Sequence, residues 1–323
     1  MISVLNRSTE FFSQFFFTMN HYIYCKKHKI DFTLDTENWT FSYEKGWTDY
    51  FEPIDLTFQD KNNNHNYSTR YGHGYIIEDV PFQEYTDIIP EMYRYNEFMK
   101  KEIEKKKKEL NLETDKYASI FIRRGDKLQC ETKYIPTEKY IECLLKQEPD
   151  CQTIFLQTDD YNCYKDIQIY LNNTNHEYIR VIKLCPESLF GLNISDREFY
   201  NTQSNIEENQ PYIEKIRSMD VQNKWVFDLY PRRFESVPQR DTQLKTVTGN
   251  VDEDSSAKRI EFFNCVNKEE LLHHMIMFLV GVDLLYQSSI CVTDYSSNVA
   301  KFLKLWKGYK VIDVLNTEYD VIW

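Results

Sequence analysis

The chain has 323 residues, enough for two domains of ordinary size rather than one. It carries 51 acidic residues against 39 basic ones, a formal net charge of −12, which argues against general nucleic-acid binding because that needs a basic surface. Its eight cysteines form no CxxC pair and no Cys/His cluster with zinc spacing. This favours reduced, mostly buried thiols over a disulfide framework or a structural metal site.

The first residues lack the basic start and apolar run of a signal peptide, and the aromatic run at 15–17 is too short to span a membrane. We therefore expect a soluble intracellular or cytoplasmic protein without a membrane segment.

The N-terminal third predicts an α/β domain over residues 1–112. Apolar residues at helical spacing predict a helix over 8–28, and alternation predicts a strand over 29–34. A long charged helix is predicted over 91–112, where the lysines at 105–108 are best explained as a solvated face. We expect this helix to connect the two domains.

The C-terminal part, residues 113–323, shows the strand–helix alternation of a doubly wound, Rossmann-like α/β domain. Strands are predicted at 118–122, 153–156, 178–184, 289–293 and 311–314, and helices at 136–147, 161–172, 268–287 and 298–306. A polar stretch over about 187–258 interrupts the alternation and is predicted to be an insertion.

Charged residues follow two of the predicted strands directly. Arg123 and Arg124 follow the first strand, at the end of an α/β sheet where ligands bind, and a guanidinium fork matches a phosphate. An Arg–Asp salt bridge that holds the loop explains the pair equally well. Asp159 and Asp160 follow the second strand, where Asp160 either contacts a bound donor or caps the next helix.

Three hydroxyl residues, Tyr295, Ser296 and Ser297, lie between a strand and a helix. Hydroxyls and backbone amides at a helix N-terminus can bind an anion, and a capping role for a serine is compatible with that. Asp283 lies in an apolar helix and needs a partner, either a sugar or base edge or an internal arginine.

The run from Arg123 to Glu131 reads Arg-Arg-Gly-Asp-Lys-Leu-Gln-Cys-Glu. It resembles the α-1,6-fucosyltransferase family, including the bacterial nodulation enzymes, which carries Arg-Arg-x-Asp-Lys followed by a Glu four residues after the Lys. Pro136 and Tyr140 extend the match, and the segments 155–160 and 283–299 resemble the second and third motifs of that family.

The resemblance implies an α/β, GT-B-like fold with two Rossmann-like halves facing a cleft. It implies GDP-fucose as donor, a glycan hydroxyl as acceptor, and inversion at the sugar carbon with neither a metal nor another cofactor. Arg123 would hold the β-phosphate with help from Ser297, and Asp283 would contact the nucleoside. Phe121 stands where the family often has a His that contacts the nucleotide.

The same resemblance assigns the catalytic roles. Glu131 would deprotonate the acceptor hydroxyl, with Asp126 and Lys127 supporting it. Two alternatives remain open: an inverting transferase with another nucleotide-sugar donor, and a glycan- or nucleotide-binding module without catalysis.

Overall fold

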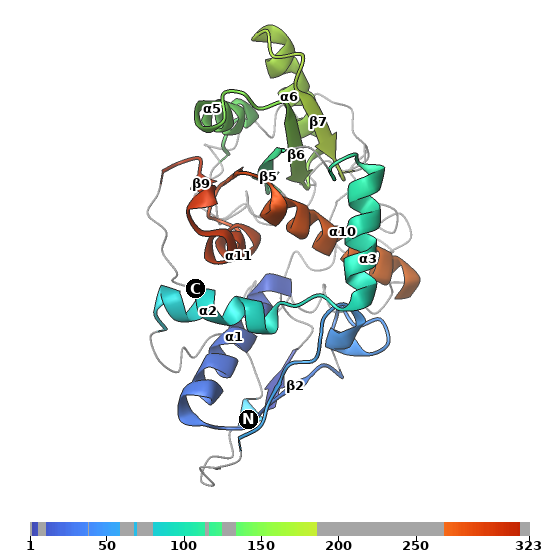
Figure 1. Ribbon diagram of the computed structural model, residues 1–323, viewed down its shortest axis with the longest axis vertical. Helices are drawn as coiled ribbons and strands as arrows, with labels where there is room; N and C mark the ends of the chain where they lie inside the picture. The colour runs from blue at the N-terminus through green and yellow to red at the C-terminus, as the bar shows by residue number, and fades with distance from the viewer. Residues whose placement is uncertain are drawn as a thin grey trace, which may run out of the picture. The chain divides into compact units, whose positions relative to one another are not determined.

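The computed structural model describes residues 2–5, 11–37, 39–58, 68–69, 80–113, 116–124, 134–185 and 268–316. These residues belong to two compact units (Figure 1). The first holds 2–106 and 268–279, and the second holds 107–185 and 280–316. The first part of the helix at 268–287 thus belongs to the first unit, whereas the sequence analysis assigned all of that helix to the C-terminal domain.

The first unit contains a four-stranded sheet in the order β3-β2-β1-β4. Strand β1 (Ile2–Val4) pairs in parallel with β2 (Phe32–Asp35) and β4 (Ser68–Thr69), while β3 (Asp55–Leu56) is antiparallel to β2. Helix α1 (Phe11–His28) connects β1 with β2, in agreement with the helix predicted over 8–28. Strand β1 has no sequence pattern that predicts it.

An aromatic cluster fills the core of the first unit. The Trp47 ring, from the short helix η1 (Gly46–Asp49), stacks on Phe51 with ring centroids 4.2 Å apart and on Phe15 at 5.8 Å. Phe11 contacts Phe278 at 6.0 Å between centroids. Offset and edge-to-face aromatic pairs contribute beyond the apolar area that they bury, so the high aromatic content of the chain serves this core.

A charged helix is confirmed within the predicted range 91–112, but it is shorter, because a separate helix ends at Met92. Helix α2 (Phe82–Met92) contains Pro90 close to its end, and α3 (Glu97–Glu109) begins after Asn96. The Asn96 side chain accepts a hydrogen bond from the Met99 backbone N–H at 2.9 Å and so caps α3. The solvated lysine face is confirmed, since Lys105 and Lys108 are exposed beside glutamates.

The second unit is built on a five-stranded, fully parallel sheet in the order β7-β6-β5-β8-β9. The strands are β5 (Ala118–Ile122), β6 (Thr153–Thr158), β7 (Arg180–Lys183), β8 (Cys291–Thr293) and β9 (Val311–Asp313). Its helices are α5 (Thr137–Gln147), α6 (Tyr161–Asn173) and α11 (Asn298–Lys307), together with the part of α10 (Lys268–Gln287) from Val280 onward. The α/β class and the doubly wound order predicted from the sequence are confirmed.

The two faces of this sheet are covered by different helices. Even-numbered residues of β5 and β6, such as Ile120 and Leu156, pack with apolar residues of α5 and α6. Odd-numbered residues face α10: the Ser119 hydroxyl lies 2.7 Å from that of Ser288, and a Cβ on Gly281 would lie 2.8 Å from the Gln157 amide carbon. Successive side chains of a strand point to opposite faces of the sheet, so even-numbered and odd-numbered residues of β5 and β6 contact different helices.

Lys307 joins the ends of α10 and α11. Its ammonium donates to the carbonyls of Leu285 at 3.1 Å and Tyr286 at 2.5 Å, and also to that of Ser288. These carbonyls belong to the end of α10, where a cation opposes the negative end of the helix dipole. Burial nevertheless lowers the pKa of Lys307 to about 8.

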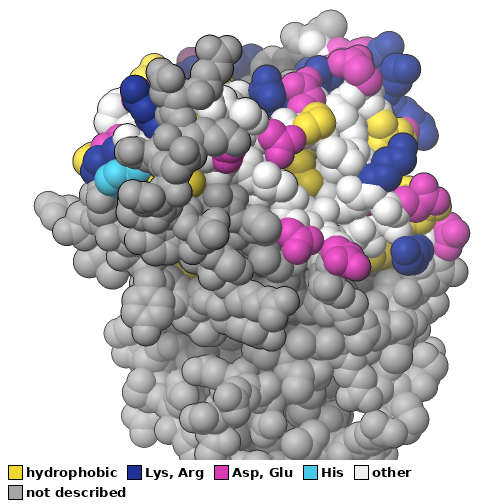
Figure 2. All heavy atoms as spheres, turned by 90° about the horizontal axis from the view of Figure 1, so that it is seen from below, with side chains coloured by type: hydrophobic (Ala, Val, Ile, Leu, Met, Phe, Trp, Pro, Cys, Tyr) yellow, Lys and Arg dark blue, Asp and Glu magenta, His cyan; other side chains and the backbone are white. Residues whose placement is uncertain are grey.

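The described surface carries mixed charge. On the face drawn in Figure 2, side chains of both signs lie near one another. Lys26 and Glu91 form an exposed ion pair. No helix of the described segments has the length and apolar character needed to cross a membrane. The six described cysteines are free thiols, and all but Cys143 are buried, as the sequence predicted.

Candidate functional site

The candidate site lies in the second unit, where β5, β6 and β8 end. Strand β5 is flanked by β6 on one side and by β8 on the other, and the chain goes first to β6 and returns to β8 much later. The connections therefore leave β5 in opposite directions. In open α/β sheets this reversal marks the place at the carboxyl edge where ligands bind.

Two arginines and two aspartates meet at this edge because their strands are in register. Phe121 pairs with Gln157 and Ile122 with Thr158, so the next positions bring Arg123 beside Asp159 and Arg124 beside Asp160. Arg123 forms an ion pair with Asp159, and Arg124 Nη1 lies 3.7 Å from Asp160 Oδ2. Arg–Asp salt bridges are thus present at this loop, and their aspartates follow the neighbouring strand.

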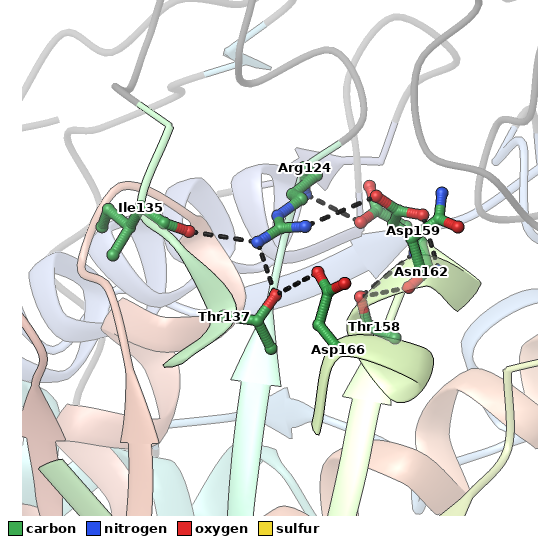
Figure 3. Close-up of polar contacts among 8 residues, drawn as sticks. Arg124, Ile135, Thr137, Thr158, Asp159, Asn162 and Asp166 are labelled. Atoms are coloured by element: carbon green, nitrogen blue, oxygen red, sulfur yellow. Dashed lines mark hydrogen bonds and ion pairs between the residues drawn. The ribbon is translucent and has the colours of Figure 1, made fainter. Parts of the chain in front are cut away.

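The Arg124 side chain is held on the α5 and α6 side of the sheet (Figure 3). Its guanidinium Nη2 donates to the Ile135 carbonyl at 3.1 Å and to the Thr137 hydroxyl at 2.9 Å. The guanidinium carbon Cζ lies over the Tyr134 ring, 4.5 Å from the ring centroid. The Thr137 hydroxyl in turn donates to Asp166 at 3.0 Å. With 2% exposure, Arg124 ties the start of α5 to the end of β5.

Asp160 begins α6. Its side chain accepts a hydrogen bond from the Asn162 backbone N–H at 3.0 Å, and its backbone is extended, as in an ordinary N-cap. The capping role considered for this position is confirmed. Asp160 is fully buried, so its carboxylate both caps the helix and faces the Arg124 charge.

The end of β8 presents a second polar group. Asp294 accepts hydrogen bonds from the Tyr140 hydroxyl at 3.0 Å, from the Ser296 backbone N–H at 3.1 Å and from the Ser296 hydroxyl. Burial raises the pKa of Asp294 above its usual value, while these three donors oppose the rise. Burial and the Asp294 charge together hold the pKa of Tyr140 far above its usual range.

Ser297 begins α11, and its hydroxyl accepts a hydrogen bond from the Ala300 backbone N–H at 3.1 Å. The predicted serine cap is therefore confirmed for Ser297. Tyr295 has a different role: its hydroxyl donates to the Val311 carbonyl at 3.0 Å, which joins the loop to β9. Burial, followed by the charge of Asp313, raises the Tyr295 pKa.

Asp283 is not brought together with these residues. It lies on α10, where its carboxylate accepts a hydrogen bond from Gln287 one turn later. Its charge also contributes to the raised pKa of Tyr117, which precedes β5 and donates to the Leu284 carbonyl at 2.8 Å. Asp283 thus lies near the amino end of β5, whereas Arg123 and Arg124 follow its carboxyl end.

The three predicted catalytic residues, Asp126, Lys127 and Glu131, lie outside the described residues, as does the predicted insertion at 187–258. Within the described segments, no group of three or more His, Cys, Asp or Glu side chains has a geometry suited to a metal ion. The roles of these residues and the expected independence of metals stay predictions.

Sequence reasoning missed the parts of the site that depend on contact between strands and helices. Thr137 and Asp166 have no motif of their own, and they join the site only because α5 and α6 pack side by side. The pairing of Arg123 with Asp159 could have been found. Two arginines after one parallel strand and two aspartates after its neighbour meet when the strands are in register.

Comparisons with known proteins give a likeness to solved structures but not to any family or curated sequence. No protein-family model matches the sequence, and no curated protein matches it either. Among the solved structures that match is the crystal structure of NodZ alpha-1,6-fucosyltransferase soaked with GDP-fucose, which is 10% identical in sequence. The match covers 94% of this chain and 91% of that chain at a TM-score of 0.42. At this identity and TM-score the likeness carries no argument about activity, and the functional conclusion rests on the site.

Proposed function

We propose that the protein is a glycosyltransferase that takes a sugar from a nucleoside-diphosphate donor and transfers it to a glycan hydroxyl. One observation carries the proposal: Arg123 directly follows β5, and the adjacent strand β8 leads into the N-terminus of α11, which Ser297 caps. An arginine and the start of a helix thus follow adjacent strands at the point where the sheet order reverses.

The arrangement suits a diphosphate for two reasons. A guanidinium pairs with phosphate oxygens through directed, charge-assisted hydrogen bonds. The first turn of a helix presents backbone N–H groups and the positive end of the helix dipole. When the sugar leaves, the diphosphate accumulates negative charge, and donors fixed in advance stabilise that charge. We propose that Arg123 supplies in this way the positive charge that other transferases draw from a metal ion.

GDP-fucose is the first donor to test. The Arg123–Glu131 segment resembles the α-1,6-fucosyltransferase motif at each of its defining positions. In this proposal Glu131 is the general base for the acceptor, Asp126 and Lys127 support it, and the reaction inverts the sugar carbon without a metal. Asp283 as a nucleoside contact is the weakest of these assignments, because it lies toward the opposite end of β5.

A donor screen tests the function directly. The purified protein is incubated with GDP-, UDP-, ADP- and dTDP-sugars, binding is measured by calorimetry, and slow hydrolysis is followed by release of the nucleoside diphosphate. We expect one donor class to bind and to be hydrolysed, with GDP-fucose first. Absence of binding to every nucleotide at millimolar concentration would contradict the proposal.

Two other results of the screen identify the alternatives. Binding and turnover of another nucleotide sugar would keep the reaction class and change the donor. Binding without turnover against a broad acceptor panel would favour a binding module.

A further inference from the structure

One carboxylate holds two groups at the end of β5. Asp159 Oδ1 accepts a hydrogen bond from the Arg124 backbone N–H at 2.7 Å, and Oδ2 forms the ion pair with the Arg123 guanidinium. The Asp159 and Arg123 side chains are 2% and 8% exposed. A single side chain thus fixes both the backbone where the strand ends and the direction of the guanidinium that leaves it.

The guanidinium groups of the two arginines are held by different partners. Arg124 contacts Ile135, Thr137 and Asp160 on the α5 and α6 side. Arg123 has the opposite parity and contacts Asp159. The strand register therefore pairs each guanidinium with one aspartate. Asp159 pairs with Arg123, the arginine that binds the diphosphate in the proposed function.

We propose that Asp159 is a positioning residue that holds the Arg123 guanidinium in the orientation that receives the diphosphate of the donor. This rests on the proposed function. An arginine side chain loses much rotational freedom when it binds an anion, and holding it in place beforehand lowers that cost. A guanidinium carries five N–H donors in a planar fork, so it can serve a carboxylate and a phosphate together.

The Asp159→Asn substitution tests the proposal because it keeps the shape and the Oδ1 acceptor and removes the charge. We expect the affinity for GDP to fall about 5- to 30-fold, with little change in the affinity for guanosine, which has no phosphate. Unchanged or tighter GDP binding would overturn the proposal, because it would mean that the carboxylate only competes with the phosphate.

Two controls separate positioning from general loss of structure. Asp49→Asn removes a carboxylate that likewise accepts from backbone N–H groups, those of Tyr43 and Lys45, but lies in the first unit outside the site, and it should leave GDP affinity unchanged. In an Arg123→Ala background, Asp159→Asn should have no further effect on GDP affinity, because its effect passes through Arg123. Equal losses in both backgrounds would contradict the proposal.

Labelling with phenylglyoxal keeps the test valid without a nucleotide. Arg123 should react faster in Asp159→Asn than in the wild-type protein, with the labelled peptide identified by mass spectrometry. If Asp159→Asn fails to fold, Asp159→Glu keeps the charge and shifts it by one methylene, and it should also react faster. If the wild-type protein binds no nucleotide, the proposed function fails, while unchanged labelling of Arg123 would still refute the positioning role by itself.

Discussion

Tyr140 and Asp294 join helix α5 to the end of strand β8 through a hydrogen bond of 3.0 Å. Both residues are buried, and Tyr140 is 2% exposed. The same carboxylate holds the Ser296 backbone N–H, so it orders the loop that leads to the Ser297 cap of α11. The phenol thereby supports the helix start that we place beside the diphosphate.

Replacing Tyr140 by Phe should lower the free energy of unfolding by about 1–3 kcal/mol at neutral pH, because a buried carboxylate loses a donor. Thermal or urea unfolding measures this change. Tyr178→Phe is the matched control, because Tyr178 is 59% exposed and its variant should unfold like the wild-type protein.

The effect of Tyr140→Phe should also depend on pH. Burial raises the pKa of Asp294 above 3.8 in the folded protein, so this group's contribution to stability is present below that pH and is lost as the pH rises through the folded value. Tyr140 donates to the ionised form, and its removal raises the folded pKa further. The destabilisation should therefore be larger at pH 7 than at pH 3.5. An equal effect at both values would mean that Tyr140 acts by packing alone.

The second unit was largely predictable because each of its elements has a local pattern. The apolar run at 118–122 is a buried parallel strand, and the helix predicted over 268–287 has those bounds. The capping roles considered for Asp160 and Ser297 are confirmed, and they were predictable because an N-cap depends on a few neighbouring residues.

The first unit was less predictable, since its elements depend on tertiary contacts. Strand β1 is three residues long and is defined by its pairing with β2 and β4. The break between α2 and α3 places Tyr95 in a bridge to Phe51, which charge patterning does not reveal. For the same reason the displacement of Asp283 from the arginines appears only in the packed structure.

Replacing Arg123 by Ala should weaken both GDP binding and catalysis. The contact is charge-assisted and largely buried, so its loss is worth about 2–4 kcal/mol in transition-state stabilisation. Calorimetry with GDP and the rate of donor hydrolysis measure the two effects. Arg94→Ala removes a surface arginine paired with Glu52 and should change neither. Unchanged GDP affinity in Arg123→Ala would move the phosphate role to another residue.

Turnover should survive a chelator. If Arg123 and the first turn of α11 stabilise the leaving diphosphate, the reaction needs no divalent cation. We expect the same rate of donor hydrolysis with and without excess EDTA. Loss of activity in EDTA that magnesium or manganese restores would refute a metal-independent mechanism.

The buried thiols should make the protein sensitive to alkali. Burial raises the pKa of Cys291 to about 11 and that of Cys163 to about 12, from 9.0. Above pH 9 these thiols ionise in the unfolded chain but stay protonated in the folded protein. The free energy of unfolding therefore falls as the pH rises, by about 1.4 kcal/mol per pH unit for each thiol.

Urea unfolding between pH 8.5 and 10 measures this slope. Cys291→Ala should flatten this pH dependence more than the control Cys143→Ala, because the Cys143 thiol is only partly buried. Identical slopes in the wild-type protein and Cys291→Ala would show that the thiol does not titrate as its burial implies.

Glu131 is our candidate for the general base. Glu131→Gln should lower the transfer rate at saturating donor and acceptor about 10²- to 10⁴-fold, with little change in donor affinity. A sugar hydroxyl is a poor nucleophile until a base begins to take its proton. Glutamine keeps the shape of the side chain and removes its basicity. Saturated transfer and GDP affinity are measured on the same preparation. Glu138→Gln, an exposed position in the first turn of α5, is the control and should change neither value.

The competing explanation is that Glu131 pairs with Lys127 and only shapes the loop. The glutamine variant would then lose stability or donor binding and keep its transfer rate at saturation, because the proton would be taken by another group. Near-normal saturated transfer in a well-folded Glu131→Gln protein would therefore remove Glu131 from the mechanism. Asp126, which lies five residues earlier in the same segment, would become the next carboxylate to test.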